Sequence, residues 1–116
     1  MAEEKPKYSL AARCAAEAVG TFTIVAGGCG AVSAARYAGG PPIAASAFAG
    51  SVMIGVYATG NVSGAHLNPA VTAACVCCDV VLGVSVERIP LLVCSEHTVS
   101  SRAAAPFLAD RLAVDR

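Results

Sequence analysis

The residues with the clearest chemical potential stand in a segment that is otherwise almost free of charge. Asn68 and Pro69 lie in the 42 residues between Arg36 and Asp79, where His66 is the only acidic or basic side chain. Asparagine is a strong helix N-cap, and proline is well tolerated at the first helical position. The pair therefore predicts that a helix begins at this point, three residues after the loop-like residues Thr59 to Gly64.

The helix that begins there is too short to cross a bilayer. About ten residues separate Pro69 from Asp79, and at about 1.5 Å per residue they reach roughly half of the hydrocarbon thickness. Non-helical backbone beside a half-length helix in a membrane must line a cavity or be covered by protein. We therefore predict a functional loop over residues 59–68 and a half-helix over residues 69–78.

The elements that position this loop are two long apolar stretches. Hydrophobic residues make up 56% of the 116 residues, charged residues only 14%, and the formal net charge is zero. A membrane helix needs about 20 mainly apolar residues, and the composition predicts such helices over residues 12–35 and 43–58, separated by a turn rich in glycine and proline. The fold class predicted is an all-α membrane protein. A balanced charge gives no reason to expect a nucleic-acid partner.

The basic residues near the N-terminus predict the orientation of the chain. Lys5, Lys7 and Arg13 precede the first helix, whereas only Arg36 follows it. The positive-inside tendency then places residues 1–11 in the cytoplasm as a short tail. The first helix would run outward, and the second would return to the cytoplasmic face.

An alternative interpretation of the first helix is a secretory signal peptide, cleaved among the small residues Ala31–Ala35. The apolar stretch is longer than a usual signal core, and Glu3 and Glu4 precede it beside the lysines. An uncleaved membrane helix is the interpretation that we favour.

Two stretches of the chain resemble the aquaporin family, also called the major intrinsic proteins. Ala16–Phe22 and Gly28–Ala31 resemble the first helix of that family, and Ser63–Thr72 matches its first pore loop at every position. The likeness covers about residues 12–74. It implies a bundle of two inverted repeats, each with a half-helix that reaches the midplane. Residues 12–78 then correspond to the first half of an aquaporin-like bundle, with two transmembrane helices, a re-entrant loop and a half-helix.

The resemblance also implies roles for the residues of the loop. The half-helix that starts at Asn68 would direct its unpaired N–H groups and positive dipole end at the centre of a pore, which repels cations. The Asn68 amide would donate to a passing oxygen, Pro69 would hold the turn, and Ala70 completes the Asn-Pro-Ala motif. Backbone carbonyls would be acceptors along the path, namely those of Gly64, Ala65 and His66.

Three further side chains have roles implied by the family. Glu17 lies inside the first helix, where a carboxylate is costly, and it is expected to accept hydrogen bonds from the pore loop; a carboxylate at the membrane boundary is the alternative. Phe48 takes the place of a constriction residue and favours water over glycerol, unless it only packs. His66 is of a type that binds metals or acts as a base, but in this motif it is expected to pack behind the loop.

The last third of the chain departs from the family. Nine of the 38 residues from Asp79 to Arg116 are charged, no uncharged run there is longer than eight residues, and no second Asn-Pro occurs. We therefore predict no further span, and residues 79–116 are expected to be a divergent, irregular polar tail. With one half-helix and one Asn68, the chain is expected not to conduct alone. It would be a fragment, a truncated product or a frameshifted gene model, or a membrane fragment that associates with full-length channel subunits.

Enzymatic and metal-binding functions find little support in the sequence. Ser63 with His66 or His97 could suggest an intramembrane protease, but His97 lies outside the predicted spans. The cysteine cluster matches no closed zinc pattern; it comprises Cys75, Cys77 and Cys78. We predict no catalysis, no metal and no cofactor. The expected partners are the lipid bilayer, water or small neutral solutes such as glycerol, and other subunits, since the family forms tetramers.

Overall fold

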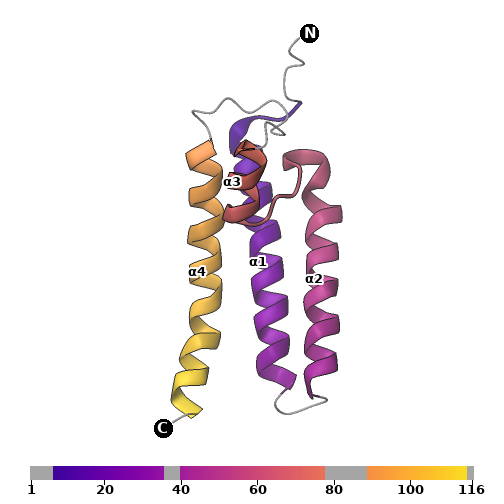
Figure 1. The fold of residues 1–116 in the computed structure, drawn as a ribbon, viewed down its shortest axis with the longest axis vertical. Helices are drawn as coiled ribbons and strands as arrows, with labels where there is room; N and C mark the ends of the chain where they lie inside the picture. Colours follow the sequence, from indigo (N-terminus) through magenta and orange to yellow (C-terminus); the bar gives the residue numbers. More distant parts are fainter. Residues whose placement is uncertain (1–6, 36–39, 78–88, 115–116) are drawn as a thin grey trace.

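The computed structural model describes residues 7–35, 40–77 and 89–114, and these residues form four helices and no strand. The helices are α1 (Leu10–Ala35), α2 (Gly40–Ser63), α3 (Pro69–Cys77) and α4 (Ile89–Val114) (Figure 1). The prediction of an all-α fold is confirmed. Residues 1–6 of the predicted tail, Gly39 of the predicted turn and residues 78–88 lie outside the described residues, and the rest of that turn, Gly40–Pro42, is helical instead.

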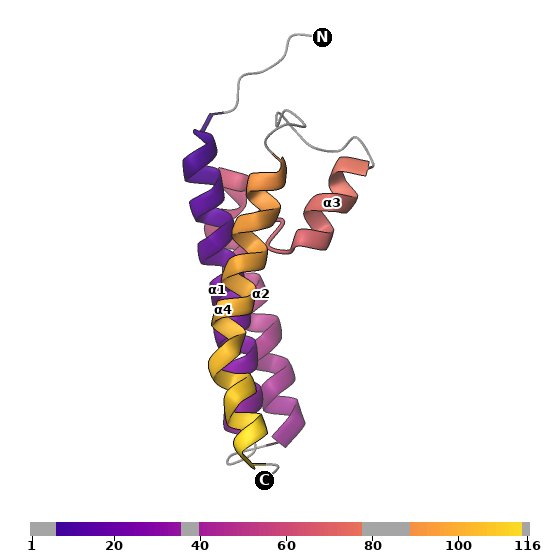
Figure 2. The ribbon, with the colours of Figure 1, turned by 90° about the vertical axis from the view of Figure 1, so that its left-hand side faces the viewer.

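Three long helices lie side by side, with α1 in contact with both α2 and α4. Helix α2 runs antiparallel to α1, and α4 runs in the same direction as α1 (Figures 1 and 2). The short helix α3 packs against α4, at the end of the bundle where α1 begins and α2 ends. The segment 64–68, between α2 and α3, therefore enters the bundle from that end.

Helices α1 and α2 have the length and apolar composition of membrane spans, and less than a quarter of each span is buried inside the structure. The residues that they do bury are mainly small or polar, whereas large apolar side chains such as Ile54 and Tyr57 are exposed, Tyr57 by 81%. Among the described residues, Leu67 is the only buried hydrophobic side chain. A water-soluble domain buries its large apolar residues, so this distribution indicates an integral membrane protein.

Small residues let α1 and α2 approach each other closely. A side chain at Gly27 would overlap the hydroxyl of Ser51 and come within 3.0 Å of its Cβ, and one at Gly28 would overlap the ring of Phe48. Lipid tails give no hydrophobic drive for helix association, so close packing of this kind holds membrane helices together. The α1–α2 contact thus depends on glycine at these two positions.

Helix α2 continues further than the sequence pattern predicts. Thr59–Ser63 were expected in the loop, but they are helical. The Thr59 hydroxyl donates to the Gly55 carbonyl at 2.9 Å, and the Ser63 hydroxyl donates to the Thr59 carbonyl at 3.3 Å. These polar side chains are thereby satisfied within the helix, which removes the main reason for a loop at that depth.

The prediction of an irregular C-terminal tail is wrong for Ile89–Val114, which form the 26-residue helix α4. The interrupted apolar runs argued against a membrane span, and α4 is indeed not among the candidate spans. A helix, however, needs only favourable residues and a surface to pack on, and α4 packs along α1. Its charged residue Glu96 is completely buried in that contact, which the run-length argument did not anticipate.

Replacing Gly27 by valine should weaken the α1–α2 contact. The new side chain would overlap Ser51, so we expect a loss of about 1–3 kcal/mol, the usual cost of overpacking. Gly50→Val is the matched control, because a side chain at this α2 glycine meets nothing within 4 Å. Thermal unfolding of the two variants in detergent, followed by circular dichroism, tests this expectation. Equal unfolding midpoints for the two variants would show that the close approach does not stabilise the protein.

Candidate functional site

The segment between α2 and α3 has a backbone conformation that needs external support. Gly64, Ala65 and Leu67 have φ angles of 95°, 52° and 53°, all in the left-handed region. Glycine adopts this region freely, but for Ala65 and Leu67 it costs about 1–3 kcal/mol each. Contacts with the surrounding helices must therefore hold these residues in place.

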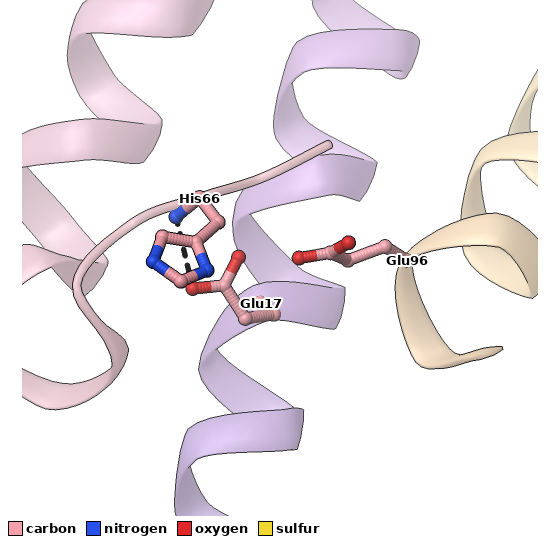
Figure 3. Close-up of side chains that lie close together, drawn as sticks. All are labelled: Glu17, His66 and Glu96. Atoms are coloured by element: carbon pink, nitrogen blue, oxygen red, sulfur yellow. Dashed lines mark hydrogen bonds between the residues drawn. The ribbon is translucent and has the colours of Figure 1, made fainter. Parts of the chain in front are cut away.

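The first support is the carboxylate of Glu17 on α1, which is 1% exposed. Its two oxygens accept the backbone N–H groups of His66 at 3.1 Å (Figure 3) and of Leu67 at 2.6 Å. Hydrogen bonds to an ionised acceptor are about twice as strong as neutral ones. One side chain of α1 thus satisfies two consecutive amides of the irregular segment.

The second support is the side chain of Leu67, which occupies a space left by two glycines. Its Cδ atoms lie where side chains of Gly20 on α1 and Gly55 on α2 would be. Leu67 is 6% exposed, so the segment is anchored between the two helices by apolar packing as well as by hydrogen bonds. A fully buried leucine contributes about 1.5–3 kcal/mol relative to an exposed one.

Arg13, one turn before Glu17 on α1, satisfies the end of α2. Its guanidinium is buried and donates to the Ser63 carbonyl over 3.4 Å. The last carbonyls of a helix lack partners within the helix, and a cation near this end is favourable. Arg13 and Glu17 therefore support the end of α2 and the start of the next segment from the same face of α1.

Asn68 is the N-cap of α3, as the sequence predicts. Its Oδ1 accepts the N–H of Ala70 at 2.8 Å, and its carbonyl accepts the N–H of Thr72 at 3.0 Å. Pro69 is the first residue of the helix. Because Oδ1 is engaged and Asn68 is exposed, its side-chain NH₂ group remains available to donate to a solute.

The same segment also offers hydrogen-bond acceptors, the carbonyl oxygens of its backbone. Gly64 is exposed and Ala65 and His66 are half-buried. Within residues 7–35, 40–77 and 89–114, the carbonyl oxygens of these three residues accept no hydrogen bond. The segment thus offers free acceptors next to the free donor of Asn68.

His66, Thr72 and Glu96 form a polar contact behind the segment. The Thr72 hydroxyl lies 3.2 Å from Nδ1 of His66 and 2.9 and 3.1 Å from the two oxygens of Glu96. Thr72 and Glu96 are both almost completely buried. The ring of His66 thus contacts Thr72 of α3, and α4 reaches the same contact through Glu96; the packing of His66 behind a pore loop stays a prediction.

The remaining predicted residues have less specific surroundings. The ring of Phe48 packs over Gly28 and is 41% exposed, so the constriction role stays a prediction. The Ser63 hydroxyl accepts the Ala65 N–H, and no hydrogen bond joins it to a histidine in the described part of the chain. Cys75 is a free thiol; Cys78, and the side chain of Cys77, lie outside the description.

Sequence reasoning missed four residues that support the segment: Arg13, Leu67, Thr72 and Glu96. Arg13 was used only as an orientation signal, although Glu17 follows it by one helical turn and shares its face. Leu67 and Thr72 were read as parts of a motif. Glu96 carried a signal, since it directly follows the seven uncharged residues Ile89–Ser95, but no pattern links it to Thr72.

Replacing Glu17 by leucine should release the segment from α1. Two buried amides would lose their acceptor at about 1–3 kcal/mol each, so we expect hydrogen exchange around residues 63–70 to accelerate at least about tenfold. Glu17→Gln, which keeps one acceptor oxygen, should give a smaller change. Thr23→Ala is the control, because Thr23 bonds only to its own helix at Val19. Exchange in Glu17→Leu that is no faster than in Thr23→Ala would contradict the supporting role.

Comparisons with known proteins agree with this geometry. Aquaporin NIP1-3 from Oryza sativa subsp. japonica is 35% identical over 109 residues, which are 90% of this chain and 37% of that protein. Aquaporin NIP1-1 from the same organism is 44% identical over 66 residues (54% of this chain, 23% of the relative), and Aquaporin Z from Bradyrhizobium diazoefficiens is 48% identical over 64 residues (50% and 26%). The chain thus spans between about a quarter and just over a third of the length of these relatives. No solved structure matches it significantly.

The sequence profile of the family described as Major intrinsic protein matches residues 4–107. This match extends beyond the resemblance at residues 12–74 and includes most of α4, so residues 79–107 of the part predicted to diverge still fall within the profile. The profile covers most of the chain, and its match agrees with two apolar helices followed by a short helix that begins at Asn-Pro-Ala. The chain therefore belongs to the Major intrinsic protein family.

Proposed function

We propose that this chain supplies the first pore half of a channel for water, built around the segment 64–68 and helix α3. The observation that carries the proposal is the state of Asn68: its Oδ1 caps α3 through the Ala70 N–H, while its exposed side-chain NH₂ group is free to donate. The adjacent carbonyls, which accept no hydrogen bond in the described residues, supply acceptors for the same water molecules. A solute that both donates and accepts hydrogen bonds suits such a lining.

The electrostatics of α3 favour neutral solutes. The first N–H groups of a helix lack partners within it and carry a partial positive charge. Pro69 has no N–H, and the N–H of Ala70 is bonded to Oδ1 of Asn68, so few free donors remain at this end. A cation that approached Asn68 would meet this positive end of α3. We therefore expect water, or a small neutral solute such as glycerol, to pass and cations to be excluded.

Water is the preferred solute in this proposal because of Phe48. A phenyl ring narrows a passage and offers no hydrogen bond to the hydroxyl groups of a polyol. Its ring rests on Gly28 of α1 with part of its surface exposed, which is compatible with a place at the edge of a pore. No step of the proposed function requires catalysis, a cofactor or a nucleic acid.

The chain is proposed not to conduct alone. The described residues contain one half-helix and one Asn-Pro-Ala, whereas the family resemblance implies two that face each other. A second half-helix is therefore proposed to be needed for conduction. The N-terminus is proposed to be cytoplasmic, which would place α3 in the cytoplasmic half of the bilayer.

A second candidate function is association with full-length channel subunits. The observation in its favour is the outer face of α2, where several large apolar side chains are exposed. They include Ile43, Val52, Met53, Ile54, Val56 and Tyr57. In a membrane such a face is covered by lipid or by another helix, and oligomers of the family would supply the latter.

Osmotic swelling of vesicles separates these functions. Vesicles with the chain alone should swell no faster than protein-free vesicles. A chimera in which this chain replaces the aligned 109-residue segment of rice Aquaporin NIP1-3 should conduct water. Asn68→Ala in the chimera should lower the flux about fivefold, as expected for the loss of one hydrogen bond of about 1 kcal/mol.

The control in the chimera is Asn61→Ala, since Asn61 is an exposed residue of α2 before the pore segment and should leave the flux unchanged. Flux through the chain alone would contradict the claim that it cannot conduct. A chimera that reaches the membrane but does not conduct, while the parent aquaporin does, would contradict the proposed pore half. If full-length channels then co-purify with the chain, association is the better description.

A further inference from the structure

Three possible metal ligands from distant parts of the sequence meet at one point of the bundle. A carboxylate oxygen of Glu17 on α1, a ring nitrogen of His66 in the pore segment and a carboxylate oxygen of Glu96 on α4 all lie within 4.8 Å of one another. Figure 3 shows the imidazole and the two carboxylates converging from three separate elements. Both carboxylates are buried, Glu17 at 1% and Glu96 at 0% exposure.

The two carboxylates lack a cationic side chain to balance them. Glu17 accepts two backbone amides, Glu96 accepts the hydroxyl of Thr72, and the two glutamate side chains are hydrogen-bonded to each other, which requires one shared proton. The nearest turn of α1 carries Arg13, but its guanidinium donates to the Ser63 carbonyl, and in the part of the chain described it forms no ion pair with either carboxylate. Burying an unpaired charge costs several kcal/mol, and two like charges at this distance repel each other. The cluster therefore needs an additional positive charge.

The types of the three ligand atoms indicate which kind of cation would fit. Two carboxylate oxygens and one imidazole nitrogen are ligands of divalent first-row metal ions, and three protein ligands leave positions for water. Thr72 is placed as an outer partner of Glu96, because its hydroxyl donates to that carboxylate; the 3.2 Å contact of the same hydroxyl with Nδ1 of His66 would be replaced if this nitrogen bound the ion. Ligands held by partners of this kind are oriented in advance.

We propose that Glu17, His66 and Glu96 form a binding site for a divalent first-row metal ion, liganded by oxygen and nitrogen. The ion would connect α1, the pore segment and α4, and would neutralise the buried carboxylates. The site does not depend on conduction by the chain, so its test needs no flux measurement. A single proton shared between Glu17 and Glu96 is the competing way to supply the charge.

The probe is Mn²⁺, because carboxylate and water ligands suit it, whereas the six cysteines of the chain favour softer ions. Electron paramagnetic resonance of free Mn²⁺, titrated into the purified full chain in detergent, counts the bound ions. We expect one saturable ion per chain. Glu96→Gln keeps the size of the side chain and an acceptor for Thr72 but removes the charge, and it should weaken binding at least tenfold. His97→Gln changes the exposed neighbouring histidine and should bind Mn²⁺ as the parent does.

Two results would overturn the proposal. One is the absence of a saturable Mn²⁺ ion in the parent chain, in which case a protonated-carboxyl infrared band that disappears in Glu96→Gln would identify the shared proton instead. The other is equal Mn²⁺ affinity of the parent and Glu96→Gln. If circular dichroism shows that Glu96→Gln has lost its helices, His66→Gln replaces it and must lower the affinity in the same way. A parent-like affinity of that variant also overturns the proposal.

Discussion

The pair of hydrogen bonds from the amides of His66 and Leu67 to Glu17 is the interaction on which the rest of the site depends. In the hydrocarbon of a bilayer no water replaces a lost partner, so irregular backbone is possible only where protein satisfies it or where it lines a water-filled cavity. The same carboxylate offsets the left-handed conformations of Ala65 and Leu67. With those conformations the segment places Asn68 at the start of α3. The burial of the Glu17 carboxylate, which is costly, is thereby explained by the two backbone amides that it holds.

The packing around this interaction inverts the usual arrangement of a soluble protein. The interior between the helices contains glycine, serine, threonine, arginine and glutamate, and the large apolar side chains of α2 face outward. Glycines at positions 20 and 55 leave the space that Leu67 fills, and those at 27 and 28 admit Ser51 and Phe48. Close helix contact and anchoring of the segment therefore come from the same property, the absence of side chains at the contact between α1 and α2.

Helix α4 adds a second polar layer to the back of the segment. Through Thr72 it places Glu96 near Glu17 and His66, so the segment is held from α1 on one side and contacted from α4 on the other. This arrangement makes the charge state of the cluster part of the stability of the segment. A bound cation or proton would strengthen the contact between α1 and α4, whereas two uncompensated carboxylates would weaken it.

The sequence by itself determined the elements whose cause is local. Long apolar stretches predicted α1 and the greater part of α2, Asn68-Pro69 predicted the start of α3 through N-cap chemistry, and a carboxylate inside an apolar helix predicted a polar partner for Glu17. Only the tertiary structure decided that Thr59–Ser63 extend α2, that Leu67 is seated between Gly20 and Gly55, and that Ile89–Val114 form a helix with Glu96 buried against Thr72. The physical reason is that these features depend on contacts between residues far apart in the chain. Neither composition nor spacing specifies which helix face will meet which partner.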